Sequence, residues 1–305
     1  MIDRQGQNMN IGIIGLGRMG ASIAHRLAKH GHTVIGFDIN AESRALAQRD
    51  GIHCVDLISD CSAQAEIIWL MVPEGKAVDD ALTGIQGGLK KHSIVIDGGN
   101  SFYKDSIARA QHLAKREINF LDCGTSGGLH GKDAGFSLMI GGNLTAYKTA
   151  QPVFEALAAP KGFAHVGPSG AGHFVKMVHN GIEYALMQAY AEGFQVLKQG
   201  PYTELNLEQI ANVWNHGAIV RSWLLELTQQ IFSRGSDFDD ISGAIGENKT
   251  GQWTVATAKM LGIPTNVIEE ALRIRAWSRE SGGNYATKLV AMMRHEFGGH
   301  EIKKI

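Results

Sequence analysis

The sequence predicts an α/β protein, with an N-terminal doubly wound Rossmann-type domain followed by an all-α C-terminal domain. In the first half, short apolar runs without polar alternation are separated by segments of helical periodicity, which is typical of a buried parallel sheet. After Pro168, every periodic segment has the spacing of a helix. We therefore expect residues 1–168 to form the first domain and residues 169–305 the second.

The elements follow from this alternation. Strands are expected at residues 10–15, 33–38, 67–72, 94–97, 119–123 and 136–140, with helices at 19–30, 41–50 and 105–115. A long helix is expected from about Ala171 to Lys198, where Gly200-Pro201 ends it, followed by helices at 208–215, 219–233, 252–261, 267–278 and 285–296. Residues 1–8 are polar and aperiodic, and predict a disordered extension.

Composition excludes several classes of protein. The 305 residues suit two domains, and 44% hydrophobic residues can build sizeable cores. A net charge of −1 without a polybasic run argues against nucleic-acid or anionic-membrane partners. The apolar run at 67–73 is too short to span a bilayer. Three cysteines without a pairing pattern, and no signal peptide, predict a cytoplasmic protein.

A glycine-rich turn indicates a dinucleotide site in the first domain. Gly15, Gly17 and Gly20 form a GxGxxG motif between a predicted strand and helix, and Asp38 closes the next strand. Such glycines allow a tight turn, close approach of a pyrophosphate, and close helix–strand packing, while the helix start attracts phosphate. Asp38 can accept hydrogen bonds from both hydroxyls of the adenosine ribose and would repel a 2′-phosphate, so we expect NAD rather than NADP.

Two further loops should lie at the same edge of the sheet. Met71-Val72-Pro73 follows one strand, and Asn100 follows another after two glycines. Ligands bind at the carboxyl edge in such folds. The cofactor-binding residues expected from the sequence are therefore Gly15, Leu16, Gly17, Arg18, Met19, Gly20, Asp38, Met71, Val72, Pro73 and Asn100.

The long helix carries a polar stripe. Lys176, His179, Asn180, Glu183 and Tyr184 recur at i, i+3, i+4, i+7 and i+8, which is one face of a helix. The intervening positions are apolar and already supply a packed side. Because unpaired buried polar groups cost about 1–3 kcal/mol each, the stripe predicts a wet cleft for a polar, anionic molecule.

The chain resembles the decarboxylating 6-phosphogluconate dehydrogenases in their short, single-α-domain form, within the β-hydroxyacid dehydrogenase superfamily. The segments that carry the resemblance are GLGRMG at 15–20, DGGNS at 97–101, TSGG at 125–128, GHFVKMVHNGIEY at 172–184 and RHEFGGH at 294–300. They cover the chain from end to end. The last two are specific, whereas the glycine motif is shared with many dehydrogenases.

The resemblance implies a role for each matching residue. Lys176 corresponds to the general base and Glu183 to the general acid. The residues that match substrate ligands are Asn100, Ser126, Gly127, Gly128, His179, Asn180 and Tyr184, with Arg279, Arg294 and His300 at the phosphate. The implied reaction is NAD-linked oxidation of 6-phospho-D-gluconate to ribulose 5-phosphate and carbon dioxide, in the pentose phosphate pathway or gluconate use.

The sequence also departs from the family pattern. Longer members have a second helical half and often take the terminal arginine and histidine from a neighbouring subunit, so the subunit that supplies Arg294 and His300 stays open. Lys249 is displaced by one residue from the family's lysine, and its contact with phosphate stays open too. NADP-using members have Asn-Arg-Thr where this chain has Asp38-Ile39-Asn40, which again favours NAD.

Chemistry and packing complete the expectations. A lysine acts as a base only when neutral, which burial favours, and its protonated form can then stabilise an enediol. No metal is expected, because no histidine pair has a metal-ligand context.

Long apolar helices predict a homodimer. The alternatives are a β-hydroxyacid dehydrogenase for a small unphosphorylated 3-hydroxy acid, which would not need Glu183 or the arginines, and a non-catalytic nucleotide sensor.

Overall fold

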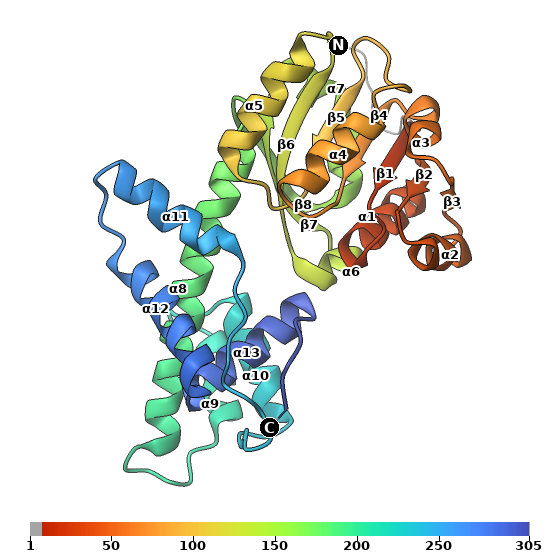
Figure 1. Cartoon of the computed structure of the whole chain (residues 1–305). Helices are drawn as coiled ribbons and strands as arrows, with labels where there is room; N and C mark the ends of the chain where they lie inside the picture. Colours follow the sequence, from red (N-terminus) through yellow and green to blue (C-terminus); the bar gives the residue numbers. More distant parts are fainter. Residues whose placement is uncertain (1–7, 305) are drawn as a thin grey trace. The chain divides into compact units, whose positions relative to one another are not determined.

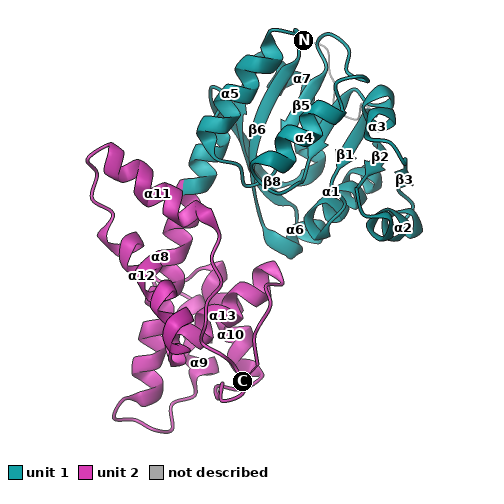
Figure 2. Cartoon of the chain, viewed as in Figure 1, with its two compact units in different colours: residues 1–177 teal, residues 178–305 magenta. Residues whose placement is uncertain are grey.

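The computed structural model describes residues 8–304, so the extension expected at residues 1–8 falls outside the described residues apart from Asn8. The chain divides into two compact units, Met1–Met177 and Val178–Ile305 (Figure 2). The division falls inside the long helix α8 (Ala171–Gln199), which is continuous across it. The domain limits expected around Pro168 stay a prediction.

Unit 1 is built on one mixed sheet (Figure 1). Within residues 8–304 this sheet has eight strands in the order β3-β2-β1-β4-β5-β6-β7-β8. Their bounds are Asn10–Ile14, Thr33–Phe37, His53–Cys54, Ile67–Leu70, Ile94–Asp97, Asn119–Ser126, Phe136–Gly142 and Ala158–Gly167 for β1 to β8. β6 and β7 pair antiparallel, and the other neighbours pair parallel. The parallel, doubly wound sheet expected from the sequence is confirmed for β1 to β6, whereas β7 runs antiparallel to β6 because the link between them is too short for a parallel crossover.

Helices cover both faces of this sheet (Figure 1). Side chains of α1 (Arg18–Lys29) and α7 (Leu144–Leu157) pack with Ile11, Ile13 and Trp69 in one core. Side chains of α3 (Ile58–Gln64), α4 (Lys76–Gly84) and α5 (Tyr103–Ala114) pack with Ile14 and Leu70 in another. The remaining elements of this unit are α2 (Ala41–Arg49), η1 (Gly128–His130) and α6 (Gly131–Ala134).

Unit 2 is helical. After α8 it contains α9 (Leu207–Asn215), α10 (Trp223–Ser233), α11 (Lys249–Met260), α12 (Asn266–Ser281) and α13 (Tyr285–Gly298). Its core gathers Met187 and Phe194 of α8 with apolar side chains of α9, α10, α12 and α13. The start expected at residue 219 is wrong: α10 begins at Trp223, because the Ser222 side chain accepts a hydrogen bond from the Leu225 N–H and caps it. Across the described residues, no helix is long and apolar enough to cross a bilayer.

Candidate active site

The glycine turn between β1 and α1 leaves open backbone where a phosphate would approach. Gly15 has φ +95°, and a Cβ there would lie 2.5 Å from the Met71 carbonyl oxygen. A Cβ on Gly20 would lie 1.8 Å from the Gly15 carbonyl oxygen, whereas one on Gly17 would meet no described atom within 4 Å. Gly17 is the N-cap of α1 and makes no side-chain capping bond. The turn therefore fits a pyrophosphate at a helix N-terminus.

Asp38 lies directly after β2, beside this turn. Its Oδ2 accepts a hydrogen bond from the Leu16 N–H at 2.7 Å, and its Oδ1 accepts one from the Asn40 N–H at 2.8 Å. A carboxylate has about four lone-pair positions, so two stay available for ribose hydroxyls. Asp38 thus fixes the glycine turn and keeps acceptor capacity for an adenosine ribose.

A buried ionic network joins the loops after β4 and β5. The Asp97 carboxylate is fully buried and accepts hydrogen bonds from the Ser101 hydroxyl at 2.6 Å and the Gly99 N–H at 3.1 Å. Arg109 lies 3.7 Å from it and donates to Asp79 at 2.8 Å and to the Gly75 carbonyl at 3.0 Å. The sequence analysis missed this network, although the DGGNS motif contains Asp97 and Ser101. The network fixes the segment that ends in exposed Asn100.

The start of α8 is anchored on β6. Asp122 is fully buried, and its carboxylate accepts hydrogen bonds from the Gly170 and His173 N–H groups at 2.6 and 2.9 Å. A Cβ on Gly124 would lie 2.3 Å from the Cβ of Lys176, so only glycine lets the helix approach the strand this closely. As a result, Lys176 is 7% exposed and its stem crosses β6. The Lys176 amine is thereby brought into a nearly closed setting.

The Ser126 turn lies at the end of the same strand. Residues two apart on a strand point to one face, so Ser126 shares the face of Gly124, which contacts Lys176. Gly127 and Gly128 follow with φ +122° and +52°, a conformation that favours glycine. Because β1, β4, β5 and β6 are parallel, the Ser126 turn lies at the same sheet edge as the glycine turn and Asn100.

In unit 2, the later residues of the stripe make a polar network. The Asn180 amide donates to the Thr250 hydroxyl at 3.1 Å, and the Tyr184 hydroxyl donates to Asn248 Oδ1 at 2.9 Å. His179 Nδ1 lies 3.7 Å from the Glu183 carboxylate. The stripe is thus partly satisfied by the start of α11, where Asn248 caps the helix and Lys249 is the first residue.

Behind Tyr184 lies an arginine that the sequence analysis did not single out. The Arg275 guanidinium stacks over the Tyr184 ring at 3.4 Å from its centroid, and the residue is 1% exposed. Burial lowers the pKa of Arg275 to about 10. One bond, from Nη1 to the Gly246 carbonyl, is long at 3.5 Å, and Nη2 has no hydrogen-bond partner among the described residues. A buried, under-satisfied guanidinium fits an anion.

Arg294 and Arg279 lie around the loop that precedes α11. Arg294 is 9% exposed, and a Cβ on Gly246 would lie 3.2 Å from its Nη1. Burial lowers the pKa of Arg294, while Tyr184 and Glu183 oppose the shift. Arg279 instead pairs with the Glu247 carboxylate at 2.8 Å and is half-exposed. Arg294 and Arg275 thus both lie at Gly246, whereas Arg279 is paired with Glu247.

His300 follows the end of α13. The helix stops at Gly299, which is left-handed with φ +59°, and the backbone oxygen of His300 lies 2.8 Å from His295 Nδ1. The His300 ring lies edge-on to Phe297, with centroids 6.2 Å apart. This fold-back keeps His300 on the same helix end that carries Arg294.

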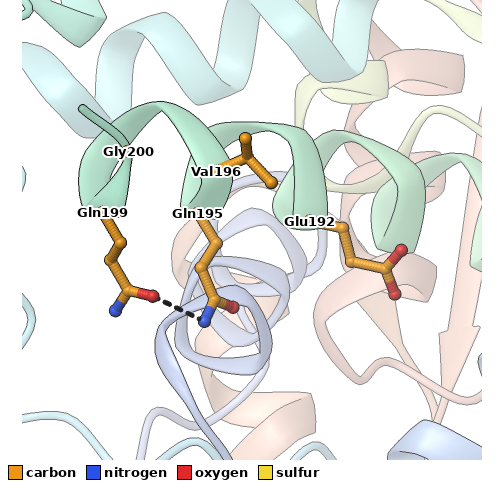
Figure 3. A pocket seen from close by; sticks show the side chains of 5 residues that line it. All are labelled: Glu192, Gln195, Val196, Gln199 and Gly200. Carbon is orange, nitrogen blue, oxygen red and sulfur yellow. Dashed lines mark hydrogen bonds between the residues drawn. The ribbon is translucent and has the colours of Figure 1, made fainter. Parts of the chain in front are cut away.

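A separate hollow of about 420 Å³ lies further along α8 (Figure 3). It is lined by Glu192, Gln195, Val196, Gln199 and Gly200, and the Gln195 amide donates to Gln199 Oε1 at 3.0 Å. Its lining includes a carboxylate but no cation, so it does not suit an anionic substrate.

The chain is similar to known dehydrogenases over almost all of its length. Residues 10–168 match the NAD binding domain of 6-phosphogluconate dehydrogenase, and residues 172–304 match the C-terminal domain of 6-phosphogluconate dehydrogenase. An NAD(+)-dependent, decarboxylating 6-phosphogluconate dehydrogenase of Haloferax volcanii is 44% identical over 301 residues, which are 97% of this chain and 99% of that relative.

Solved structures agree at the level of the fold. The 6-phosphogluconate dehydrogenase of Plasmodium falciparum matches with a TM-score of 0.79 and 28% identity, over 89% of this chain and 62% of that one. The 3-hydroxyisobutyrate dehydrogenase of Mycobacterium tuberculosis matches with a TM-score of 0.77 and 22% identity, over 95% and 99% of the two chains. The second likeness bears on the fold alone.

Proposed function

Since the chain belongs to the 6-phosphogluconate dehydrogenase family, we propose that it oxidises and decarboxylates 6-phospho-D-gluconate to ribulose 5-phosphate and carbon dioxide, with NAD as the oxidant. The observation that carries this proposal is the buried pair Arg275 and Arg294 beside Tyr184 and Glu183. A small unphosphorylated hydroxy acid has only its carboxylate, which is proposed to bind at the Ser126 turn, whereas 6-phosphogluconate adds a phosphate that these two cations can bind.

Lys176 is the proposed general base. Its stem is enclosed against Gly124, on the face of β6 that also carries Ser126. The neutral amine takes the proton from the hydroxyl group β to the substrate carboxylate. NAD, held by the residues at the carboxyl edge of the sheet, would supply the acceptor for the hydride that leaves the carbon bearing this hydroxyl. The ammonium that Lys176 has become then donates to the new ketone oxygen.

Loss of carbon dioxide follows from that polarised ketone. The carbon–carboxyl bond breaks, its electron pair forms an enediol, and the Lys176 ammonium stabilises the developing charge. Glu183, two helical turns further along α8, is the proposed acid that delivers a proton to the carbon that lost its carboxyl group. His179 lies 3.7 Å from Glu183 and is a proposed substrate ligand that also orients it.

The remaining residues are proposed to hold the substrate. Ser126, Gly127 and Gly128 supply a hydroxyl and backbone donors for the carboxylate, and Asn100, Asn180 and Tyr184 bind hydroxyl or phosphate oxygens. Arg275 and Arg294, with His300, bind the phosphate. We assign Arg279 chiefly to holding the Glu247 loop, since its charge is already paired.

The cofactor is proposed to bind along the sheet edge. Its expected ligands are Gly15, Leu16, Gly17, Arg18, Met19, Gly20, Asp38, Met71, Val72, Pro73 and Asn100. The free acceptor capacity of Asp38 favours unphosphorylated ribose, which supports NAD over NADP.

We further propose that the chain works as a homodimer through an apolar face of α8. Ile182, Leu186 and Val196 are 51%, 44% and 70% exposed, and Ala189 and Gly193 lie between them on the same stripe. Light scattering of wild type and Leu186→Lys tests this, with a monomeric wild type as the contrary result.

Two assays test the proposed reaction. Purified protein with NAD and 6-phosphogluconate is expected to release NADH and carbon dioxide in equal amounts. The same assay with 3-hydroxyisobutyrate or glycerate tests the small-substrate alternative. Turnover of these acids in preference to 6-phosphogluconate would overturn the proposal, and cofactor binding without turnover of any acid would favour a sensor.

A further inference from the structure

Three charged side chains gather at the adenosine end of the sheet edge. Asp38 follows β2, Asp56 follows β3, and Arg44 lies in the second turn of α2. β2 and β3 are parallel, so both carboxylates lie at the edge that carries the glycine turn. A dinucleotide-binding fold recognises the ribose 2′ position near this corner.

Arg44 bridges the two acids. Its Nη1 donates to the backbone carbonyl of Asp38 at 2.8 Å, and its Nη2 pairs with the Asp56 carboxylate at 3.1 Å. The Arg44 side chain is 19% exposed, whereas that of Asp56 is 91% exposed. The guanidinium is therefore held against the ribose-binding residue by a partner that stands in solvent.

The charges oppose one another in their effect on a 2′-phosphate. Asp38 repels it, and Arg44 is a guanidinium of the kind that binds phosphate with two parallel hydrogen bonds. Asp56 occupies one edge of that guanidinium and adds a second negative charge. An ion pair this exposed is worth only about 0–1 kcal/mol, so a phosphate could compete for Arg44.

We propose that Arg44 is a specificity-determining residue whose attraction for a 2′-phosphate is held back by Asp56, so that the Asp38–Arg44–Asp56 cluster, rather than Asp38 alone, sets the choice between NAD and NADP. The inference rests on the proposed dinucleotide site. The rival role for Arg44 is a purely structural clamp between α2 and the β3 loop.

Binding of ADP-ribose and 2′-phospho-ADP-ribose tests this without catalysis, because the two ligands differ only in the 2′-phosphate. Calorimetry is done on wild type, Asp56→Asn, Arg44→Met, Arg44→Lys and the control Arg49→Met, an exposed arginine at the other end of α2. Binding too weak for direct titration is measured by displacement of ADP-ribose.

Asp56→Asn is expected to lower the dissociation constant of 2′-phospho-ADP-ribose by about fivefold, which corresponds to the largest free energy expected for so exposed an ion pair. Arg44→Met is expected to weaken it by about tenfold or more, with Arg44→Lys between, since one charge-assisted contact is lost. The dissociation constant of ADP-ribose in these variants, and those of both ligands in the Arg49→Met control, should change by less than about twofold.

The outcomes separate the inference from its premise. Equal losses for both ligands in Arg44→Met would establish the clamp and overturn the inference, and so would unchanged binding of 2′-phospho-ADP-ribose in Asp56→Asn. If wild type binds neither ligand, it is the proposed dinucleotide site that fails.

Discussion

Arg275→Met separates a binding role from a structural one. Burial lowers the pKa of Arg275 from its ordinary value to about 10, a shift that corresponds to about 3 kcal/mol, since one pKa unit is about 1.36 kcal/mol. At pH 7, below both values, the guanidinium is charged in the folded and unfolded chains, so the whole cost acts against folding. It would be relieved only above the folded-state pKa.

Methionine removes this cost and also removes the stacking on Tyr184, which is worth about 1–2 kcal/mol. The free energy of unfolding is therefore expected to rise by about 1–2 kcal/mol. The catalytic efficiency, in contrast, should fall. Loss of charge-assisted hydrogen bonds worth about 1.5–3 kcal/mol lowers kcat/KM for 6-phosphogluconate by about 10- to 150-fold.

The assay compares 6-phosphogluconate with unphosphorylated gluconate at saturating NAD, alongside urea unfolding. The ratio of the two kcat/KM values should collapse in Arg275→Met, because the loss concerns the phosphate. Arg273→Met is the matched control: that side chain, on the same helix, is 70% exposed and pairs with Glu270. A variant of Arg275 that keeps this ratio within threefold of wild type, or that merely unfolds, would refute the reasoning.

Three other substitutions bear on the fold and the chemistry. Lys176→Met should lower kcat by about 100-fold or more while ADP-ribose still binds; turnover near wild type would remove it as the base. Gly124→Ala puts a Cβ 2.3 Å from that of Lys176, so we expect about 1–3 kcal/mol lower stability in urea, and an unchanged midpoint would contradict the close packing. Burial lowers the pKa of His32 below 6.5, and its Nδ1 lies 3.4 Å from the Met9 N–H. Unfolded chains then bind the extra proton, so stability should fall as pH drops below about 6.5, and His32→Gln should flatten that slope.

Periodicity predicts the buried strands well but not the edge of the sheet. The apolar runs at β1, β4 and β5 are fully enclosed, and their pattern is strong enough to identify them. β8 contains Pro160 and Gly162, and among the strands of residues 8–304 it pairs with β7 alone, so its strand conformation comes from that pairing rather than from its own residues. The two-residue β3 is beyond any periodic signal.

The site shows the same division between local and tertiary information. Motifs identify the glycine turn and the helix stripe, whose spacing is local. Arg275 was missed because an arginine in a helix is expected in solvent, although it lies four residues after Ala271 and three before Ser278, which are both buried. The feature that suggests its function is a guanidinium stacked on the Tyr184 ring with an Nη2 that has no hydrogen-bond partner among the described residues. This feature exists only once α12 packs against α8.

The proposed base and acid share one element, which constrains the chemistry. Lys176 and Glu183 are seven residues apart on the continuous helix α8, so their backbones are about 10.5 Å apart along its axis and their side chains leave the same face. Oxidation occurs at the carbon β to the carboxylate, and protonation at its neighbour, so the two groups serve adjacent atoms. Two long side chains can converge across such a gap. The Gly124 contact and the hydrogen bonds to Asp122 therefore matter beyond stability, because they position the first turns of α8, from which the Lys176 side chain extends.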